Sequence, residues 1–211
     1  MTWVSPTWRG FPGRFIVVLP IPQAASGAVA TEFDLDVLVV QQADNGNTER
    51  ATIVSRLFEP SALTEDAVRI GDIKLDTARY KLAADARAFG IRITRQGPSR
   101  PNPYSDETLT LYVPQGPKLA KVLDALEVAQ DRGEWDTNCT GTFESIRGTL
   151  SVARDTSNGY ADLLLRESRA LTRSTMQGEE CVTRAMPWTF GTKVLRYNGT
   201  HYRTPKSDKG N

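Results

Sequence analysis

Three Asn-Gly dipeptides, each between segments rich in apolar and β-branched residues, constrain the fold of this chain more than any other feature. They are Asn45-Gly46, Asn158-Gly159 and Asn198-Gly199. Asn and Gly tolerate the positive φ angles that a tight hairpin turn requires, so this dipeptide commonly joins neighbouring antiparallel strands. The three turns therefore predict a protein built from β-hairpins.

The segments around these turns show the alternation of apolar and polar residues that is typical of half-buried strands. Strands are predicted at 33–40, 51–58, 70–75, 88–94, 109–113, 141–153, 160–166, 193–197 and 201–203. Segment 118–128 fits a helix by the spacing of its leucines, or a strand. Its short length and the Pro-Gln-Gly-Pro turn before it favour the strand.

Together these elements predict a mainly β protein, with antiparallel hairpin or meander sheets that form a sandwich, a barrel or a propeller-like domain. A chain of 211 residues with 39% hydrophobic and 24% charged residues is an ordinary globular protein. We expect one β-rich domain at 31–205 and a frayed, charged tail at 206–211.

The first thirty residues have the order of a secretory signal peptide. Two arginines and no acidic residue come first, an apolar run follows at 15–22, and an A-x-A sequence ends the segment at 28–30. This order matches a basic region, an apolar region and a cleavage site. The alternative is a β-strand at 15–19 after a Gly/Pro-rich arm. We expect 1–30 to be a signal peptide or flexible arm that contributes little to the core.

The only two cysteines, Cys139 and Cys181, both lie among polar, turn-forming residues. A buried core thiol would normally have apolar neighbours. In an oxidising compartment the pair would form a disulfide that closes a loop of about forty residues. A metal site would need two further ligands, and the chain has a single histidine, His201. We therefore predict a disulfide and no metal.

Charge and apolar run lengths argue against several classes of partner. The chain has 26 Lys and Arg against 25 Asp and Glu, a net charge of +1, so no overall field attracts nucleic acid. No run approaches the roughly 20 apolar residues that cross a bilayer, so we expect a soluble mature chain without a transmembrane segment. Neither a P-loop nor a G-x-G-x-x-G motif occurs, and no cofactor is expected.

The best candidates for binding lie in loops. Segment 96–105 contains three prolines, which donate no backbone hydrogen bonds, so it is predicted to be a loop. A Pro-rich loop that carries Arg and Tyr is the kind of surface that contacts a partner, although an ordered loop without a ligand is the alternative. The candidate binding residues are Arg95, Arg100, Tyr104 and Trp135. We expect the loops at 96–105 and 131–142 to meet another envelope protein or a polymer.

Three short segments resemble those of a known group of proteins. They are Trp135–Cys139, Gly159–Leu163 and Leu195–Tyr202. Their succession is similar to that of uncharacterised exported proteins of Gram-negative bacteria, in which a terminal hairpin with the pattern RY-turn-Gly-x-x-Y closes a β domain. The resemblance implies a periplasmic or secreted location and no particular activity.

Catalysis has few candidates in this sequence. A Ser-His-Asp triad would need His201, which follows the last Asn-Gly turn, and no G-x-S-x-G motif occurs. Glu134, Asp136 and Glu144 lie close in sequence, and paired carboxyls can support glycoside hydrolysis. We expect an exported cell-envelope protein that binds or has a structural role through surface loops. The alternative is a hydrolase of an envelope polymer that uses these three carboxylates.

Overall fold

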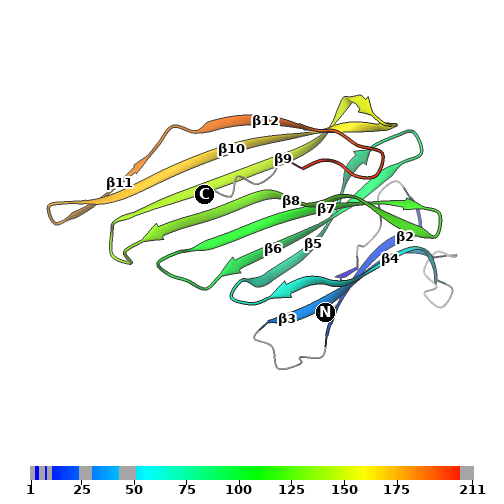
Figure 1. Ribbon diagram of the computed structural model, residues 1–211, viewed down its shortest axis with the longest axis horizontal. Helices are drawn as coiled ribbons and strands as arrows, with labels where there is room; N and C mark the ends of the chain where they lie inside the picture. Colours follow the sequence, from blue (N-terminus) through cyan, green and yellow to red (C-terminus); the bar gives the residue numbers. More distant parts are fainter. Residues whose placement is uncertain (1–2, 5–7, 9–10, 24–29, 43–50, 205–211) are drawn as a thin grey trace. The chain divides into compact units, whose positions relative to one another are not determined.

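The computed structural model describes residues 3–4, 8, 11–23, 30–42 and 51–204, and these residues form an all-β protein (Figure 1). The strands are β1 (Trp3–Val4), β2 (Arg14–Pro22), β3 (Thr31–Gln42), β4 (Ala51–Glu65), β5 (Arg69–Lys81), β6 (Arg87–Gly97), β7 (Tyr104–Gln115), β8 (Lys118–Trp135), β9 (Gly141–Ser157), β10 (Tyr160–Gln177), β11 (Glu180–Ala185) and β12 (Thr189–Leu195). The predicted β class is confirmed. Among the described residues, no helix has the length and apolar character to cross a membrane.

The chain divides into two compact units. Unit 1 comprises Met1–Ala67, Ile73–Arg92 and Thr110–Val122, and unit 2 comprises Val68–Asp72, Ile93–Leu109 and Leu123–Asn211. Strands β5 to β8 therefore contribute residues to both units. Whether these units fold together as the single domain expected at 31–205 stays a prediction. The tail expected at 206–211 lies outside the described residues.

In unit 1 the hydrogen-bonded strand order is β1-β2-β3-β4-β8-β7-β6-β5. Each of β1, β2 and β3 pairs antiparallel with the strand that follows it in the chain, whereas β4 and β8 pair parallel at Arg56 and Lys118. The predicted hairpin of 33–40 and 51–58 is present as β3 and β4, although its Asn-Gly turn lies outside the described residues. Aromatic rings fill part of the core, where Phe89 contacts Trp8 edge-on and stacks on Tyr112.

The expectation that residues 1–30 contribute little to the core is wrong. Strand β2 pairs with β3 along its whole length, and Ile16 and Val18 are completely buried. A strand with apolar residues on both faces has the same composition as the apolar region of a signal peptide, so composition alone misleads here. Proline cannot donate a hydrogen bond to a neighbouring strand. Strand β1 pairs with β2 only at Val17 and Val18, so among the described residues no second strand pairs with β2 at Pro20 and Pro22.

Unit 2 is centred on the long hairpin of β9 and β10. Strand β10 pairs with β9 on one side and on the other with β12 and then β11, which lie one after the other along it (Figure 1). The predicted turn between 141–153 and 160–166 is confirmed, since Asn158 and Gly159 both have positive φ angles, of 49° and 88°. Strand β11 was not among the predicted strands, and the predicted strand at 193–197 covers only the end of β12.

The terminal turn that carries the resemblance packs onto the hairpin of β9 and β10. Tyr197 and Tyr202 form an isolated bridge across the turn, and both are buried. The Tyr202 hydroxyl donates a hydrogen bond of 2.6 Å to the carbonyl oxygen of Ala161, and the Asn158 side chain donates one of 2.7 Å to that of Tyr197. These bonds attach the end of the described chain to the start of β10.

Strand β8 differs most from its sequence pattern. Its buried residues are Leu119, Val122, Leu123, Leu126 and Val128. This spacing suits a helix, but the segment is extended, as predicted, and the positive φ of Ala125 marks an irregularity that breaks the strict alternation. The expectation of a loop at 131–142 is wrong, because β8 pairs with β9 as far as Trp135 and the loop covers only 136–140.

Candidate functional site

The candidate site is a groove of about 470 Å³ in unit 2, formed where β6 to β10 approach the ends of their hairpins. Its lining includes Tyr104, Ser105, Asp131, Phe143, Ser145 and Thr172. The volume is within the range of small-ligand sites in proteins, roughly 300–1,000 Å³. The groove is therefore large enough to hold a ligand or one segment of a polymer.

The register of three strands builds the floor of the groove. Ser145 of β9 lies opposite Asp131 of β8 and Ala170 of β10, and Phe143 lies opposite Thr172 of β10. Side chains two residues apart on a strand point to the same face of a sheet. The two rows therefore project from one face and place a carboxylate, two hydroxyls and an aromatic ring side by side.

Asp131 is the charged centre of this floor. Arg147 donates two hydrogen bonds to its carboxylate, at 2.9 and 2.8 Å, and the Ser105 hydroxyl lies 3.4 Å away. Partial burial would raise the pKa of Asp131, but hydrogen bonds from Arg147 and Ser145 lower it below the ordinary value. Asp131 is thus a fixed, ionised acceptor at neutral pH.

One end of the groove is aromatic. A Cβ atom at Gly133 would lie 2.6 Å from Phe143 Cδ1 and 3.2 Å from Pro103 Cγ, so only glycine lets the Phe143 ring lie across β8. The Trp135 ring is 6.4 Å from the Phe143 ring between centroids, at an angle of 56°. The absence of a side chain at Gly133 therefore leaves room for the ring that lines the groove.

The rim is the proline-rich loop at 98–103, which lies within the predicted loop at 96–105. Its prolines cannot donate hydrogen bonds, but their carbonyl oxygens can accept them. The backbone N–H of Trp135 donates to Pro101 at 2.7 Å, and that of Gly133 donates to Pro103 at 3.0 Å. The loop is therefore attached to the end of β8.

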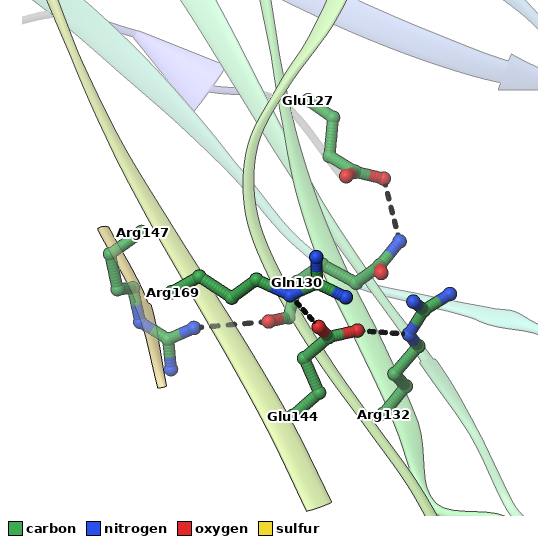
Figure 2. A network of polar contacts seen from close by, with 6 residues as sticks. All are labelled: Glu127, Gln130, Arg132, Glu144, Arg147 and Arg169. Carbon is green, nitrogen blue, oxygen red and sulfur yellow. Dashed lines mark hydrogen bonds and ion pairs between the residues drawn. The ribbon is translucent and has the colours of Figure 1, made fainter. Parts of the chain in front are cut away.

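A network of charged side chains adjoins the groove (Figure 2). Glu144 is buried and lies between Arg132 and Arg169, which donate hydrogen bonds to its two carboxylate oxygens. Burial opposes ionisation, but the hydrogen bonds from the two arginines lower the pKa of Glu144. Beside this cluster, Gln130 donates a hydrogen bond of 2.8 Å to Glu127. Burial, and then the negative charge of Asp106, raise the pKa of Glu127.

The same substitution at these two glutamates should therefore have opposite effects on stability. Glu144→Gln should lower the free energy of unfolding by about 1–2 kcal/mol, because it weakens two charge-assisted bonds whose arginines are more than half exposed. Glu127→Gln should leave stability unchanged or raise it, because it removes an unfavourable charge and keeps an acceptor for Gln130. Urea unfolding at neutral pH measures both.

The pH dependence provides a check on Glu144. A carboxyl with a lowered folded-state pKa contributes stability above its unfolded pKa of 4.5, and this contribution is lost as the pH falls through the folded-state pKa. The difference between wild type and Glu144→Gln should accordingly disappear in acid. A difference that stays constant with pH would mean that the ionised side chain contributes nothing.

The structure separates the four predicted binding residues. Tyr104 lines the groove, and Trp135 contacts Phe143 of its lining. Arg95 instead forms an ion pair of 3.5 Å with Asp106, and Arg100 is exposed in the loop at 98–103. Two of the four are thus at or next to the groove.

The three predicted carboxylates have different surroundings, and the register of β8 and β9 places two of them, Glu134 and Glu144, on the same face of the sheet. Glu144 lines the groove, while Glu134 is exposed on β8. Asp136 accepts hydrogen bonds from the backbone N–H groups of Asn138 and Cys139, which lower its pKa and hold the turn at 136–140. Asp136 therefore has a structural explanation.

The predicted disulfide is present: Cys139 and Cys181 are bonded, with their Cα atoms 5.6 Å apart. It ties the loop at 136–140 to β11. His201 is exposed in the terminal turn, where its backbone N–H donates a hydrogen bond to the Asn198 side chain. Within the described ranges, no group of three or more His, Cys, Asp or Glu side chains is arranged to hold a metal ion.

No family model matches this chain, and neither the curated proteins nor the solved structures contain a significant match. The site therefore rests on its own geometry. Sequence reasoning missed Asp131, Phe143 and Ser145, because it placed the first in a loop and had no register for the others. One sequence signal could have indicated the groove. Phe143 and Gly133 lie in segments that could pair as neighbouring strands, and an aromatic ring packs readily across a glycine.

Proposed function

We propose that the protein is an exported binding protein of the bacterial cell envelope, and that it holds a segment of a polysaccharide in the groove of unit 2. The observation that carries the proposal is the arrangement of Asp131, held ionised, beside the hydroxyls of Ser105 and Ser145 and the ring of Phe143. Sugars present hydroxyl groups at their edges and apolar C–H groups on their faces. Carboxylates and hydroxyls can hydrogen-bond to the sugar hydroxyl groups, and aromatic rings can pack against the apolar C–H faces.

The neighbouring row of side chains extends this surface. Arg147 of β9 lies opposite Ser168 of β10, which in turn lies opposite Phe190 of β12. Arg147 also bonds Asp131 of the floor, so this row projects from the same face as the groove. Phe190 is 80% exposed. A polymer that leaves the groove along this face would meet a second aromatic ring.

The disulfide supports the proposed location. Disulfides form and persist in oxidising compartments, which include the periplasm and the cell exterior, and are rare in the cytosol. The bond between Cys139 and Cys181, together with the sequence resemblance to exported Gram-negative proteins, favours export.

The alternative, a hydrolase at Glu134, Asp136 and Glu144, needs a carboxyl that stays protonated near neutral pH to act as a general acid. The pKa values of Asp136 and Glu144 are both lowered. A lowered pKa favours the ionised form of both carboxyls, and Glu134 is outside the lining of the groove, which together support binding over hydrolysis.

Co-sedimentation with purified peptidoglycan sacculi tests the proposal. Asp131→Asn and Phe143→Ala should each weaken binding about tenfold, because one loses a charge-assisted acceptor and the other loses a stacking ring. The matched controls are Asp155→Asn, on the exposed end of β9, and Phe58→Ala, on an exposed position of β4 in unit 1. Both controls should bind as wild type does.

Thermal melting of each variant separates lost binding from lost structure. Equal binding by wild type, Asp131→Asn and Phe143→Ala would contradict the proposal. Release of soluble sugars from the sacculi by wild type, abolished by Glu144→Gln in a folded variant, would establish the hydrolase alternative instead.

A further inference from the structure

A second hollow lies in unit 1, along β5 and β6. It is an open cavity of about 850 Å³, and β5 is the last strand in the order of this unit. Four basic side chains line it: Lys74, Arg79, Arg87 and Arg92. Asp76 is the one acidic residue in that lining, so basic side chains outnumber acidic ones there by three. The whole chain carries only +1, which makes this a local concentration of charge.

Asp76 neutralises one of the arginines, and its carboxylate oxygens already accept three hydrogen bonds. Its carboxylate accepts hydrogen bonds from Arg92 Nε at 2.8 Å and from the Tyr80 hydroxyl at 2.9 Å, and it also accepts one from the Ala78 backbone N–H. Arg92 is thereby held in one orientation at the cavity wall. Among the described residues, Asp76 forms no hydrogen bond or ion pair with Arg79 or Arg87.

Arg79 and Arg87 are the groups available to a ligand. Neither forms an ion pair with a residue that the structure describes. Arg87 Nε is buried and has no hydrogen-bond partner within the described part of the chain. A buried donor without an acceptor is unfavourable, and natural proteins contain few of them. Because Nε has almost no exposed surface, a ligand in the cavity would contact the exposed part of the Arg87 side chain, which lines the cavity.

We propose that this cavity binds the phosphate group of a phosphorylated ligand, through Arg79 and Arg87 with support from Lys74 and Arg92. A guanidinium group presents paired N–H donors that match two oxygens of a phosphate, and several arginines can bind different edges of one tetrahedral group. A carboxylate has only two oxygens, in one plane, and can accept from fewer of these donors at once. The site is separate from the groove of unit 2, and the proposal stands without the proposed function.

Isothermal titration with glycerol 3-phosphate and with inorganic phosphate tests the proposal on the full chain. Arg79→Gln and Arg87→Gln should each weaken binding about tenfold, because each removes charge-assisted hydrogen bonds. Lys81→Gln is the matched control, since Lys81 is an exposed cation of β5 that does not line the cavity. It should bind phosphate as wild type does, and added salt should weaken binding in both.

Vesicles of phosphatidylcholine with and without phosphatidic acid identify the source of the phosphate. Binding to the acidic vesicles that Arg79→Gln weakens indicates a lipid headgroup, whereas binding of glycerol 3-phosphate alone indicates a soluble ligand. Both results support the phosphate site. The proposal is overturned if no phosphate probe binds, if the arginine variants bind as Lys81→Gln does, or if succinate binds as tightly as phosphate. Arg79 is exposed, so its variant remains informative if Arg87→Gln fails to fold.

Discussion

Deleting residues 1–22 is expected to leave unit 1 unable to fold. Ile16 and Val18 are fully buried and Trp8 is 1% exposed. Burial of each such side chain contributes about 1.5–3 kcal/mol, and a domain is stable by only about 5–15 kcal/mol. Loss of β2 would also expose one edge of β3 along nine paired residues. Circular dichroism and urea unfolding of the truncated protein measure the effect.

A matched pair of point variants on β2 isolates the role of burial. Ile16 is 0% exposed and Ile21 is 42% exposed. Ile16→Ala should lower the free energy of unfolding by about 2–5 kcal/mol, whereas Ile21→Ala should change it by less than about 1 kcal/mol. Equal effects would show that β2 does not pack as described.

The burial of β2 also bears on export. Cleavage after Ala30 would remove β2, so we expect folded protein from an envelope fraction to retain residues 14–22. Mass spectrometry of the protein from that fraction identifies its first residue and so shows whether β2 is retained. A folded, ligand-binding protein that begins near Thr31 would contradict the role of β2 in the core.

Loss of the disulfide is expected to have the second large effect. The bond closes a loop between residues 42 apart in sequence, which corresponds to roughly 4 kcal/mol of stabilisation by restriction of the unfolded chain. Replacement of Cys139 and Cys181 by serine together should lower the melting temperature by about 10 °C. The strand content should stay the same, because β11 also pairs with β10 through its backbone.

Reduction of the wild type gives an independent measure of how much the disulfide stabilises the protein. Dithiothreitol should destabilise the wild type to the level of the double serine variant and should have no effect on that variant. Because the loop at 136–140 follows Trp135 directly, the variant should also bind sacculi less tightly. Identical melting of oxidised and reduced wild type would show that the bond contributes no stability.

Local chemistry explains what could be predicted. The turn at Asn158-Gly159 depends on φ angles that these two residue types favour, so its position and the hairpin around it follow from the dipeptide. The loop at 98–103 follows from prolines that donate no hydrogen bonds. The disulfide followed from two cysteines in polar, turn-rich segments. Each of these features depends on a few neighbouring residues.

Other features depend on partners that lie far away in the sequence. Residues 15–19 are apolar in a signal peptide and in a strand alike, and only pairing with β3 distinguishes the two. The end of β8 lies in the segment 131–142 that was expected to be a loop, and there Arg132 and Glu144 compensate each other only when β8 and β9 are in register.

The β class, the turn at Asn158-Gly159 and the cysteine pair could be predicted from the sequence, because each results from backbone preferences or side-chain chemistry within a short segment. Where the binding groups gather depends on the tertiary fold. A shift of one residue in strand register moves every side chain to the opposite face. The register of three strands thus places Asp131, Ser145 and Phe143 in one groove, and the position of β5 beside β6 brings Arg79 and Arg87 to one cavity.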